Sequence, residues 1–309
     1  MQWRTKITDL LDCKYPIIQG AFGAFGTSAI AAAVSDAGGL GIIAATALRT
    51  PKRLREDIHK ARSMTHQPFG VNLSLVGHPN IDEFREVAME ERVAAIFTSA
   101  YNAQAHGKRI KEAGIPWIHK VATLKHALAA ERHGADAVVI VGIEGVGEKS
   151  ELQLTTLTSV TMAAKMLKVP VIAAGGIGDA RSFLAALAMG AEAVYMGTAF
   201  MATKEFPISE RYKQALVNAS PLDPNVKNRA FAPPPPGLAE MIKRQDIWHA
   251  RKKIFQPIDT LGGSMAVGAI TEVVTARKLI DSIIRGAEAI LAGEGPLGRI
   301  LAANSNNLS

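Results

Sequence analysis

Eight short apolar segments recur along the chain at regular spacing, and this repetition constrains the fold more than any other feature. They are residues 16–21, 39–45, 68–75, 93–100, 116–122, 136–144, 169–174 and 193–196. Each has the length of a strand and is followed by a segment with helical periodicity. Strands that alternate with helices form parallel sheets, and a doubly wound sheet usually has fewer than eight such strands. The pattern therefore predicts an α/β protein with a (β/α)8 TIM barrel.

The regular spacing ends after residue 203. Segment 204–265 contains a helical pattern at 209–219, a proline run at 233–236 and a basic helical pattern at 242–254, and a last amphipathic helix is predicted at 267–291. A long insertion in a barrel enzyme often packs over one end of the barrel. We therefore predict a barrel formed by residues 1–203 and 266–309, with a C-terminal excursion, 204–265, that covers the barrel mouth as a lid.

Composition narrows the class of protein. Cys13 is the only cysteine, which rules out an intrachain disulfide and indicates a reducing compartment, so we expect a cytoplasmic protein. The amino terminus lacks the apolar core of a signal peptide, and no apolar run is long enough to span a bilayer. The eight histidines show no spacing typical of a metal site.

The formal net charge of +7 bears on the partner. The basic residues are spread along amphipathic segments and are not massed with aromatic residues, which argues against a nucleic-acid-binding protein. The charge is compatible with an anionic small molecule or an acidic carrier as partner. An equally good explanation is that it only keeps the protein in solution.

The ends of the last two predicted strands are rich in glycine. Gly175 and Gly176 precede a helix that is expected to start near Asp179, and Gly197 with Thr198 repeats the arrangement one unit later. Glycine lets the backbone approach a ligand closely, and a helix N-terminus offers a positive dipole and free N–H groups. If only one of these two pairs were present, a tight turn would be enough to explain its glycine. Two pairs after the seventh and eighth strands predict a phosphate site, which barrel enzymes commonly have there.

Six motifs occur in the order found in the nitronate monooxygenase family, which this sequence resembles. They are Pro16-Ile-Ile-Gln-Gly20, Gly38-Gly-Leu-Gly41, Phe69-Gly-Val-Asn72, Glu144-Gly-Val-Gly147, Ala174-Gly-Gly-Ile177 and Met196-Gly-Thr-Ala-Phe200. That family, formerly called 2-nitropropane dioxygenases, also includes FMN-dependent enoyl-acyl-carrier-protein reductases and NADH:quinone reductases. The resemblance implies an FMN-dependent oxidoreductase on a TIM barrel.

The resemblance also implies which residues bind the cofactor. The positions that match are Gly175, Gly176, Gly197 and Thr198 for the phosphate; Gly20, Ala21, Phe22 and Asn72 for the isoalloxazine ring and ribityl chain; and Gly145 and Gly147 in the loop after the sixth strand. Lys120 matches a flavin-contacting position, where a cation would stabilise the anionic reduced flavin. Simpler explanations are a strand-end hydrogen bond for Asn72 and a solvated side chain for Lys120. His119 should face the helix layer, because side chains alternate along a strand, and is therefore expected to be structural.

One position departs from the family pattern. Where the family typically has two glycines and then a histidine that acts as base or hydrogen-bond donor, this chain reads Gly145-Val-Gly147-Glu148. A glutamate has a reference pKa of about 4.3, so it needs burial to act as a base near neutrality. Glu148 is the candidate catalytic residue, with three open roles: a re-tuned base, an anchor for a cationic group of the substrate, or a solvated loop residue.

The resemblance implies oxidation of a small carbanion-type substrate, such as an alkyl nitronate, with oxygen as acceptor. The alternatives are an NAD(P)H-dependent FMN reductase of a quinone or enoyl thioester, a flavin-binding barrel without efficient turnover, and a flavin-free lyase or isomerase that binds phosphate. Expected partners are a small-molecule or acyl-thioester substrate and, as electron donor, NADH or NADPH. A homodimer is compatible with each of these functions, and neither nucleic acid nor a membrane is expected as a partner.

Overall fold

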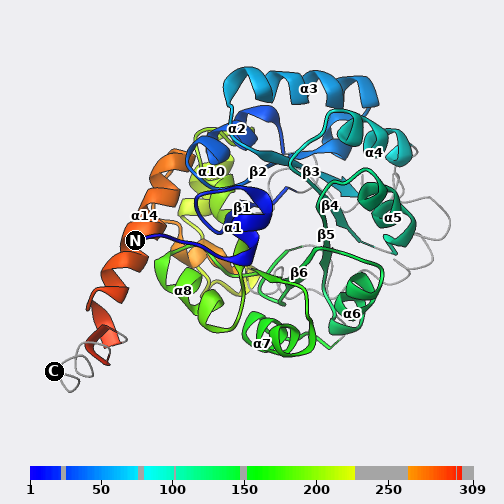
Figure 1. The fold of residues 1–309 in the computed structure, drawn as a ribbon. Helices are drawn as coiled ribbons and strands as arrows, with labels where there is room; N and C mark the ends of the chain where they lie inside the picture. The colour runs from blue at the N-terminus through cyan, green and yellow to red at the C-terminus, as the bar shows by residue number, and fades with distance from the viewer. Residues whose placement is uncertain are drawn as a thin grey trace.

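The computed structural model describes residues 1–21, 26–75, 80–100, 102–146, 152–226, 264–296 and 298–300. Its eight strands are parallel and form one barrel-shaped sheet in which β1 pairs with β8 (Figure 1). The strands are β1 (Ile17–Gln19), β2 (Gly41–Ala44), β3 (Phe69–Ser74), β4 (Ala95–Ser99), β5 (Trp117–Val121), β6 (Ala137–Val141), β7 (Val171–Ala174) and β8 (Ala193–Met196). Each lies inside one of the eight predicted segments. The (β/α)8 barrel is confirmed.

The seam between β1 and β2 closes the barrel. It has no regular ladder, only a parallel bridge between Ile18 and Leu40, in which Gln19 N donates to Leu40 O at 2.9 Å. The side chain of Gln19 adds one bond to this pairing, because its Oε1 accepts from Ile42 N of β2 at 2.8 Å. Its Nε2 donates to the carbonyl oxygen of the next residue, Gly20, at 2.9 Å. Gln19 is fully buried. A side-chain amide therefore adds one hydrogen bond to β2 where the regular backbone ladder is missing.

Helices form the outer ring of the barrel (Figure 1). Their bounds are α2 (Ser28–Asp36), η1 (Ala45–Leu48), α3 (Pro51–Met64), α4 (Ile81–Glu90), α5 (Gln104–Glu112), α6 (Leu124–Arg132), α7 (Thr156–Met166), α8 (Ala180–Ala188) and α14 (Ala276–Leu291). Thr50 caps α3, because its Oγ1 accepts from Arg53 N at 3.3 Å and Pro51 follows it at the first helical position. α14 packs against α8 and α2, so the C-terminal part of the chain completes the ring.

The last helix begins later than its amphipathic pattern indicated. It was expected from residue 267, but the chain first forms a 3-10 turn, η2 (Met265–Ala269), and α14 starts only after Thr275. Thr275 is the cap, since its side chain accepts from Lys278 N at 3.1 Å. Before this cap, Val274 lies in a bridge with Thr203, and Lys204 N donates to Val274 O at 2.8 Å. The pairing of segments 202–204 and 274 keeps this stretch extended.

The helix predicted around 209–219 is present as α10 (Glu210–Val217), which follows the short helix α9 (Thr198–Met201). The proline run at 233–236 and the basic helical pattern at 242–254 lie outside the described residues. The bridge between Thr203 and Val274 joins the two flanks of the excursion. The insertion therefore leaves and re-enters the barrel at neighbouring positions.

The core has two layers. Alternate strand residues pack outward against the helices, as Trp117 and Val138 do, and the others fill the barrel interior, as Phe97 and Ile118 do. Helix α1 (Lys6–Leu11), dark blue near the centre of Figure 1, adds Ile7 and Leu11 to the interior layer. Its Lys6 N donates at 3.0 Å to Glu192, which immediately precedes β8. Helix α1 thus covers the amino ends of the strands.

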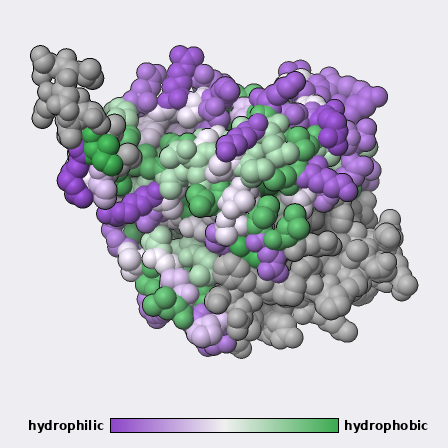
Figure 2. Space-filling model, turned by 90° about the horizontal axis from the view of Figure 1, so that it is seen from below, coloured by the Kyte–Doolittle hydropathy of each residue, from purple (hydrophilic) through white to green (hydrophobic). Residues whose placement is uncertain are grey.

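Apolar side chains gather on the face of the barrel that α7 forms (Figure 2). Figure 2 looks at this side, the lower side of Figure 1, and shows hydrophobic residues between hydrophilic ones. Leu157, Met162 and Met166 of α7 are among the exposed apolar side chains. None of the helices in the described part of the chain combines the length and the apolar character that a membrane-spanning helix requires.

The seam gives a first prediction. Gln19→Met keeps the volume of the side chain but leaves the buried Ile42 N–H without its acceptor, so the free energy of unfolding should fall by about 1–3 kcal/mol. Urea denaturation followed by circular dichroism measures this. Gln104→Met, at an exposed position of α5, is the control and should have little effect. Equal effects of the two substitutions would show that Gln19 does not hold the seam.

Candidate functional site

The residues expected to bind a cofactor gather at the carboxyl ends of the strands. Those that the structure describes lie after or near the ends of β1 (Gly20 and Ala21), β3 (Asn72), β5 (Lys120), β6 (Gly145), β7 (Gly175 and Gly176) and β8 (Gly197 and Thr198). Because all strands are parallel, these ends meet at one edge of the barrel, opposite α1. Phe22, Gly147 and Glu148 lie outside the described residues.

The loop after β7 requires its glycines. Gly175 and Gly176 have φ angles of +110° and +73°, in the region that favours glycine. A Cβ on Gly175 would lie 2.8 Å from Thr156 Oγ1 and 3.1 Å from Gly142 O, so the backbone there is packed too closely for any side chain. The β6 loop approaches it as well, since a Cβ on Gly145 would lie 3.3 Å from Gly175 Cα. This edge is therefore built from closely packed backbone.

Glu144 connects the β6 loop to its neighbours. Its Oε2 accepts from Thr156 N at 2.7 Å and lies 2.8 Å from Thr156 Oγ1, which in turn lies 3.0 Å from Gly175 O. The single hydroxyl hydrogen of Thr156 can serve only one of these two acceptors at a time. The carboxylate caps the start of α7 and thereby fixes the β6 loop beside Gly175. Sequence reasoning placed Glu144 in a motif without giving it this role, which depends on contacts between separate loops.

The start of α8 differs from the sequence expectation. Asp179 caps the helix, since its Oδ1 accepts from Ser182 N at 2.7 Å, and Ser182 Oγ accepts from Gly178 N and Asp179 N at 3.1 Å each. The prediction that α8 offers free N–H groups here is therefore wrong for these three amides, because local side chains already bind them. These three amides are therefore not available to a phosphate at this edge.

The chain returns from the excursion at the same edge. Ser264 N donates to Thr198 Oγ1 at 3.0 Å, and Met265 N donates to Glu144 O at 3.0 Å. The point of return is therefore fixed to both the β8 end and the β6 loop. A threonine hydroxyl that accepts one hydrogen bond still has its own hydrogen to donate. Thr198 can therefore serve a ligand while it holds Ser264.

Asn72 carries an unpaired polar atom in the interior of the barrel. The side chain is only 2% exposed, and its Oδ1 has no hydrogen-bond partner among the described residues. A buried acceptor without a donor costs about 1–3 kcal/mol, so native structures rarely keep one without a reason. The atom lies on the strand face that points into the barrel, since its neighbours Val71 and Leu73 pack outward. Within the described part of the chain, this oxygen can therefore still accept a hydrogen bond.

Lys120 also faces the barrel interior. Its neighbour on the strand, Ile118, belongs to the interior layer, and Lys120 Nζ lies 5.9 Å from the centroid of the Tyr195 ring. His119 faces outward and is buried, and its Nδ1 lies 2.8 Å from Thr98 Oγ1, which accepts from Trp117 Nε1 at 2.7 Å. The structural role expected for His119 is confirmed. The alternation along β5 thus places one cation towards the barrel axis.

Tyr195 has a polar role that its apolar surroundings concealed in the sequence. Its ring is buried in the barrel core, and its hydroxyl accepts from Ala21 N at 3.0 Å and donates to Ala21 O at 3.3 Å. Burial raises the pKa of the Tyr195 phenol far above its usual range, so the group keeps its hydrogen. A Cβ on Gly20 would lie 2.8 Å from the tyrosine ring. The ring therefore explains the glycine at the end of β1.

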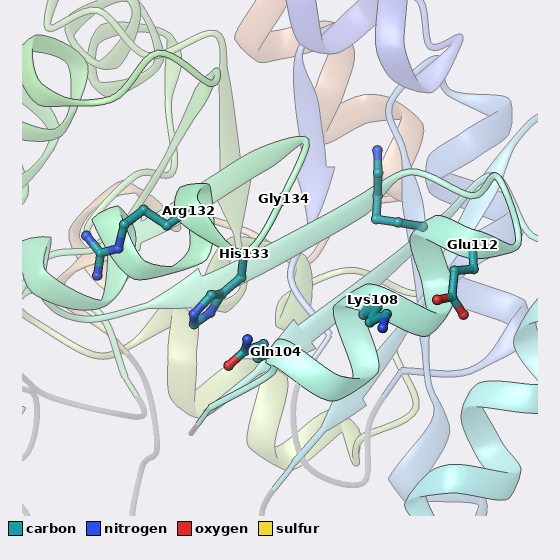
Figure 3. Close-up of a pocket in the computed structure, with 7 residues that line it drawn as sticks. Gln104, Lys108, Glu112, Arg132, His133 and Gly134 are labelled. Carbon is teal, nitrogen blue, oxygen red and sulfur yellow. The ribbon is translucent and has the colours of Figure 1, made fainter.

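A separate hollow of about 580 Å³ lies in the helix layer. Figure 3 shows its lining: Gln104, Lys108 and Glu112 on α5, and Arg132, His133 and Gly134 at the end of α6. Lys111, which also lines it, pairs with Asp136, the residue before β6. The hollow thus lies on the outside of the barrel and towards the amino ends of the strands. It is not part of the candidate site.

The fold is a (β/α)8 barrel, and the candidate site lies at the carboxyl ends of its strands. The chain belongs to the nitronate monooxygenase family, whose sequence model matches residues 4–95 and 76–245. The resemblance noted from the six motifs is confirmed, and the protein is an oxidoreductase. This membership replaces the alternative of a lyase or isomerase.

Relatives with known names fall into more than one group. A probable nitronate monooxygenase of Staphylococcus aureus (strain MSSA476) is 31% identical over 272 residues, which cover 74% of this chain and 76% of the relative. The (3aS,4S,5R,7aS)-5-hydroxy-7a-methyl-1-oxo-octahydro-1H-indene-4-carboxyl-CoA dehydrogenase of Mycobacterium tuberculosis (strain ATCC 25618 / H37Rv) is 35% identical over 220 residues, 71% of this chain and 61% of the relative. Both alignments span most of this chain.

Solved structures agree with the fold. FabK from Thermotoga maritima superposes with a TM-score of 0.79 at 34% identity, covering 93% of this chain and 97% of that one. A nitroalkane oxidase from Streptomyces ansochromogenes superposes with a TM-score of 0.72 at 23% identity, covering 92% and 98%, and supports the fold alone.

The unpaired atom of Asn72 gives a second prediction. In the protein without ligand, Asn72→Leu removes an unsatisfied acceptor, so the free energy of unfolding should stay the same or rise by up to about 2 kcal/mol. This is the opposite sign to Gln19→Met, where a satisfied buried amide is lost. Urea denaturation of both variants compares them directly. A loss of stability in Asn72→Leu as large as in Gln19→Met would show that Asn72 is a structural residue.

Proposed function

We propose that the protein is an FMN-dependent oxidoreductase that binds its cofactor at the carboxyl edge of the barrel. The unpaired Oδ1 of Asn72 carries this proposal, because a buried acceptor beside a glycine-lined edge fits a ligand that donates a hydrogen bond. Bound FMN would supply two-electron chemistry, taking electrons from a substrate and passing them to an acceptor. The family membership supports the same cofactor.

The glycine-rich loops would hold the phosphate. Gly175 and Gly176 have positive φ angles, which glycine adopts readily, and without side chains their backbone can approach a ligand closely. Next to Gly197, Thr198 adds a hydroxyl that still has its hydrogen to donate. The close packing of Gly145 against Gly175 supports a rigid edge, which loses little freedom when a ligand binds. Gly147, in the same loop, is proposed to contribute backbone.

Residues of β1, β3 and β5 would face the ring and ribityl chain. Asn72 would accept a hydrogen bond, and Lys120 would place a positive charge where the reduced cofactor becomes negative. Gly20, Ala21 and Phe22 are proposed to line the ring from the end of β1. The side chain of Lys120 is flexible, so the position of its ammonium depends on the groups that contact it. The stabilisation that it would give the reduced cofactor depends on that position.

The proposed substrate is a small carbanion-type molecule such as an alkyl nitronate, with oxygen as acceptor. The printed name of the Staphylococcus aureus relative supports it. Glu148 is the proposed catalytic residue, and its role as the base is the one that would handle a proton of this substrate. An ionised glutamate can accept a proton or attract a cationic group. Unlike a neutral histidine, it has no hydrogen to donate in a hydrogen bond.

A second candidate is the reduction of a quinone or an enoyl thioester with NADH or NADPH as donor. The Mycobacterium tuberculosis relative, named for a CoA substrate and 35% identical, favours a thioester in this group. Glu148 in place of histidine also fits this candidate, because hydride transfer from a nicotinamide needs no base that removes a carbon-bound proton.

Anaerobic mixing separates these candidates. The purified protein should be yellow, and a colourless preparation that takes up no FMN would contradict the cofactor. Loss of flavin absorbance only with an alkyl nitronate supports the monooxygenase, and rapid loss with NADH or NADPH supports the reductase. Absorbance that no donor changes would favour a barrel that binds flavin without efficient turnover.

The proposed lid, cellular location and oligomeric state stay predictions. Segment 204–265 is proposed to cover the mouth, which its return at Ser264 and Met265 supports, since both residues are bonded to the site edge. A cytoplasmic location and a homodimer are expectations from the sequence.

The phosphate assignment gives a third prediction. Gly176→Ala should weaken FMN binding at least tenfold, because φ +73° is strained for alanine and the new Cβ would lie 3.2 Å from Glu144 Cβ. Gly114→Ala is a matched control: its φ is +72°, nothing lies within 4 Å, and it is remote from the site. Both variants carry a similar strain of about 1 kcal/mol. Fluorescence titration with FMN should separate them, and equal affinities would refute the assignment.

Glu148 gives a fourth prediction. Glu148→Gln keeps the size of the side chain and removes its charge, so substrate-driven loss of flavin absorbance should slow by about 10²-fold or more if Glu148 is the base. FMN retention should stay unchanged. Stopped-flow absorbance under anaerobic conditions gives the rate. A rate equal to that of the parent protein would leave Glu148 as a solvated loop residue.

A further inference from the structure

We propose that Tyr195 is a positioning residue, which fixes two groups that would face the flavin from opposite walls of the barrel: the main chain of Ala21 and the ammonium of Lys120. The inference rests on the proposed FMN site. In the strand order β1-β8-β7-β6-β5, the ends of β1 and β5 lie across the barrel from each other, and Tyr195 stands on β8, next to β1. One side chain thus reaches both walls.

On the β1 side, the tyrosine hydroxyl holds the peptide groups of one residue. It accepts from Ala21 N at 3.0 Å and donates to Ala21 O at 3.3 Å, so both polar groups of Ala21 are bound to the same atom. Ala21 is 4% exposed, and hydrogen bonds count for more in such a buried place than in water. Tyr195 therefore fixes the main chain after β1 at the middle one of the three residues proposed to line the ring.

On the β5 side, the ring faces the ammonium. Lys120 Nζ lies 5.9 Å from the ring centroid, within the range of about 6 Å for a cation–π contact. The ring itself is held by Phe97, whose centroid is 6.1 Å away, and by the close approach of Gly20. Burial keeps the phenol neutral, so Tyr195 adds no negative charge beside the ammonium. The ring restricts where a flexible lysine can place its charge.

The hydroxyl of Tyr195 is expected to affect the affinity for FMN, and the ring is expected to affect its reduction potential. Two substitutions separate these effects. Tyr195→Phe removes the hydroxyl and keeps the ring, so Ala21 loses both hydrogen bonds while Lys120 keeps its contact. The dissociation constant for FMN should rise about tenfold, which corresponds to roughly 1.4 kcal/mol. The midpoint reduction potential of bound FMN should stay close to that of the parent protein.

Tyr195→Leu removes the ring as well. The ammonium of Lys120 then loses the face against which it lies, and the midpoint potential should become more negative, because a less well placed cation stabilises the anionic reduced flavin less. In a Lys120→Met background the same substitution should shift the potential no further, since the cation is already absent. Tyr15→Leu is the control: it removes a similar contact, Lys14 Nζ 4.9 Å from the Tyr15 ring, before the start of β1.

The test combines FMN titration, potentiometry of the bound FMN and thermal unfolding of each variant. Weaker binding in Tyr195→Phe together with a Lys120-dependent potential shift in Tyr195→Leu supports the inference. Lower melting temperatures with unchanged FMN affinity and potential overturn it, because Tyr195 then serves only the core. An equal potential shift with and without Lys120 also overturns it. If the parent protein itself takes up no FMN, the proposed function fails, and this result is seen before any variant is made.

Discussion

Closure of a parallel sheet into a ring is the constraint on which the rest of the structure depends. Parallel strands in a closed barrel share one direction, so every carboxyl end lies at the same edge and no strand is left without a neighbour. The seam between β1 and β2 is the weakest part of this ring, since a single bridge and the side chain of Gln19 hold it. Helix α1 occupies the amino end of the interior. The carboxyl edge is where residues from separate units can meet.

At that edge the loops are held mainly by one another. Glu144 reaches Thr156, the Thr156 hydroxyl lies against Gly175 O, and Ser264 and Met265 tie the returning chain to Thr198 and Glu144. These bonds join residues that are far apart in sequence, so each loop is stabilised by tertiary contacts more than by its own turn. A rigid, glycine-lined edge suits a proposed role in holding a phosphate, because little conformational freedom remains to be lost on binding.

The pattern of apolar residues predicted the strands correctly, but it did not predict where the last helix begins or how the first amides of α8 are bonded. The strands lie within the predicted segments because apolar runs of this length are buried on both faces in a parallel barrel. The predicted start of the last helix was wrong, because the amphipathic pattern continues through the turn η2 and the segment after it. The pairing of Thr203 with Val274 keeps that segment extended. Free amides at the start of α8 were also expected, but Asp179 and Ser182 bind three of the amides there. The pattern of apolar residues does not reveal competition from local polar side chains.

The sequence by itself determined the barrel, the family and the residues that gather at its mouth, because periodicity and motif order are properties of the chain read in one dimension. Only the tertiary structure decided which polar atoms meet. It showed that the Oδ1 of Asn72 is buried without a partner among the described residues, that Gln19 closes the seam, and that the hydroxyl of Tyr195 binds Ala21. Such contacts depend on distances between separate strands, and these distances are set by closure of the sheet.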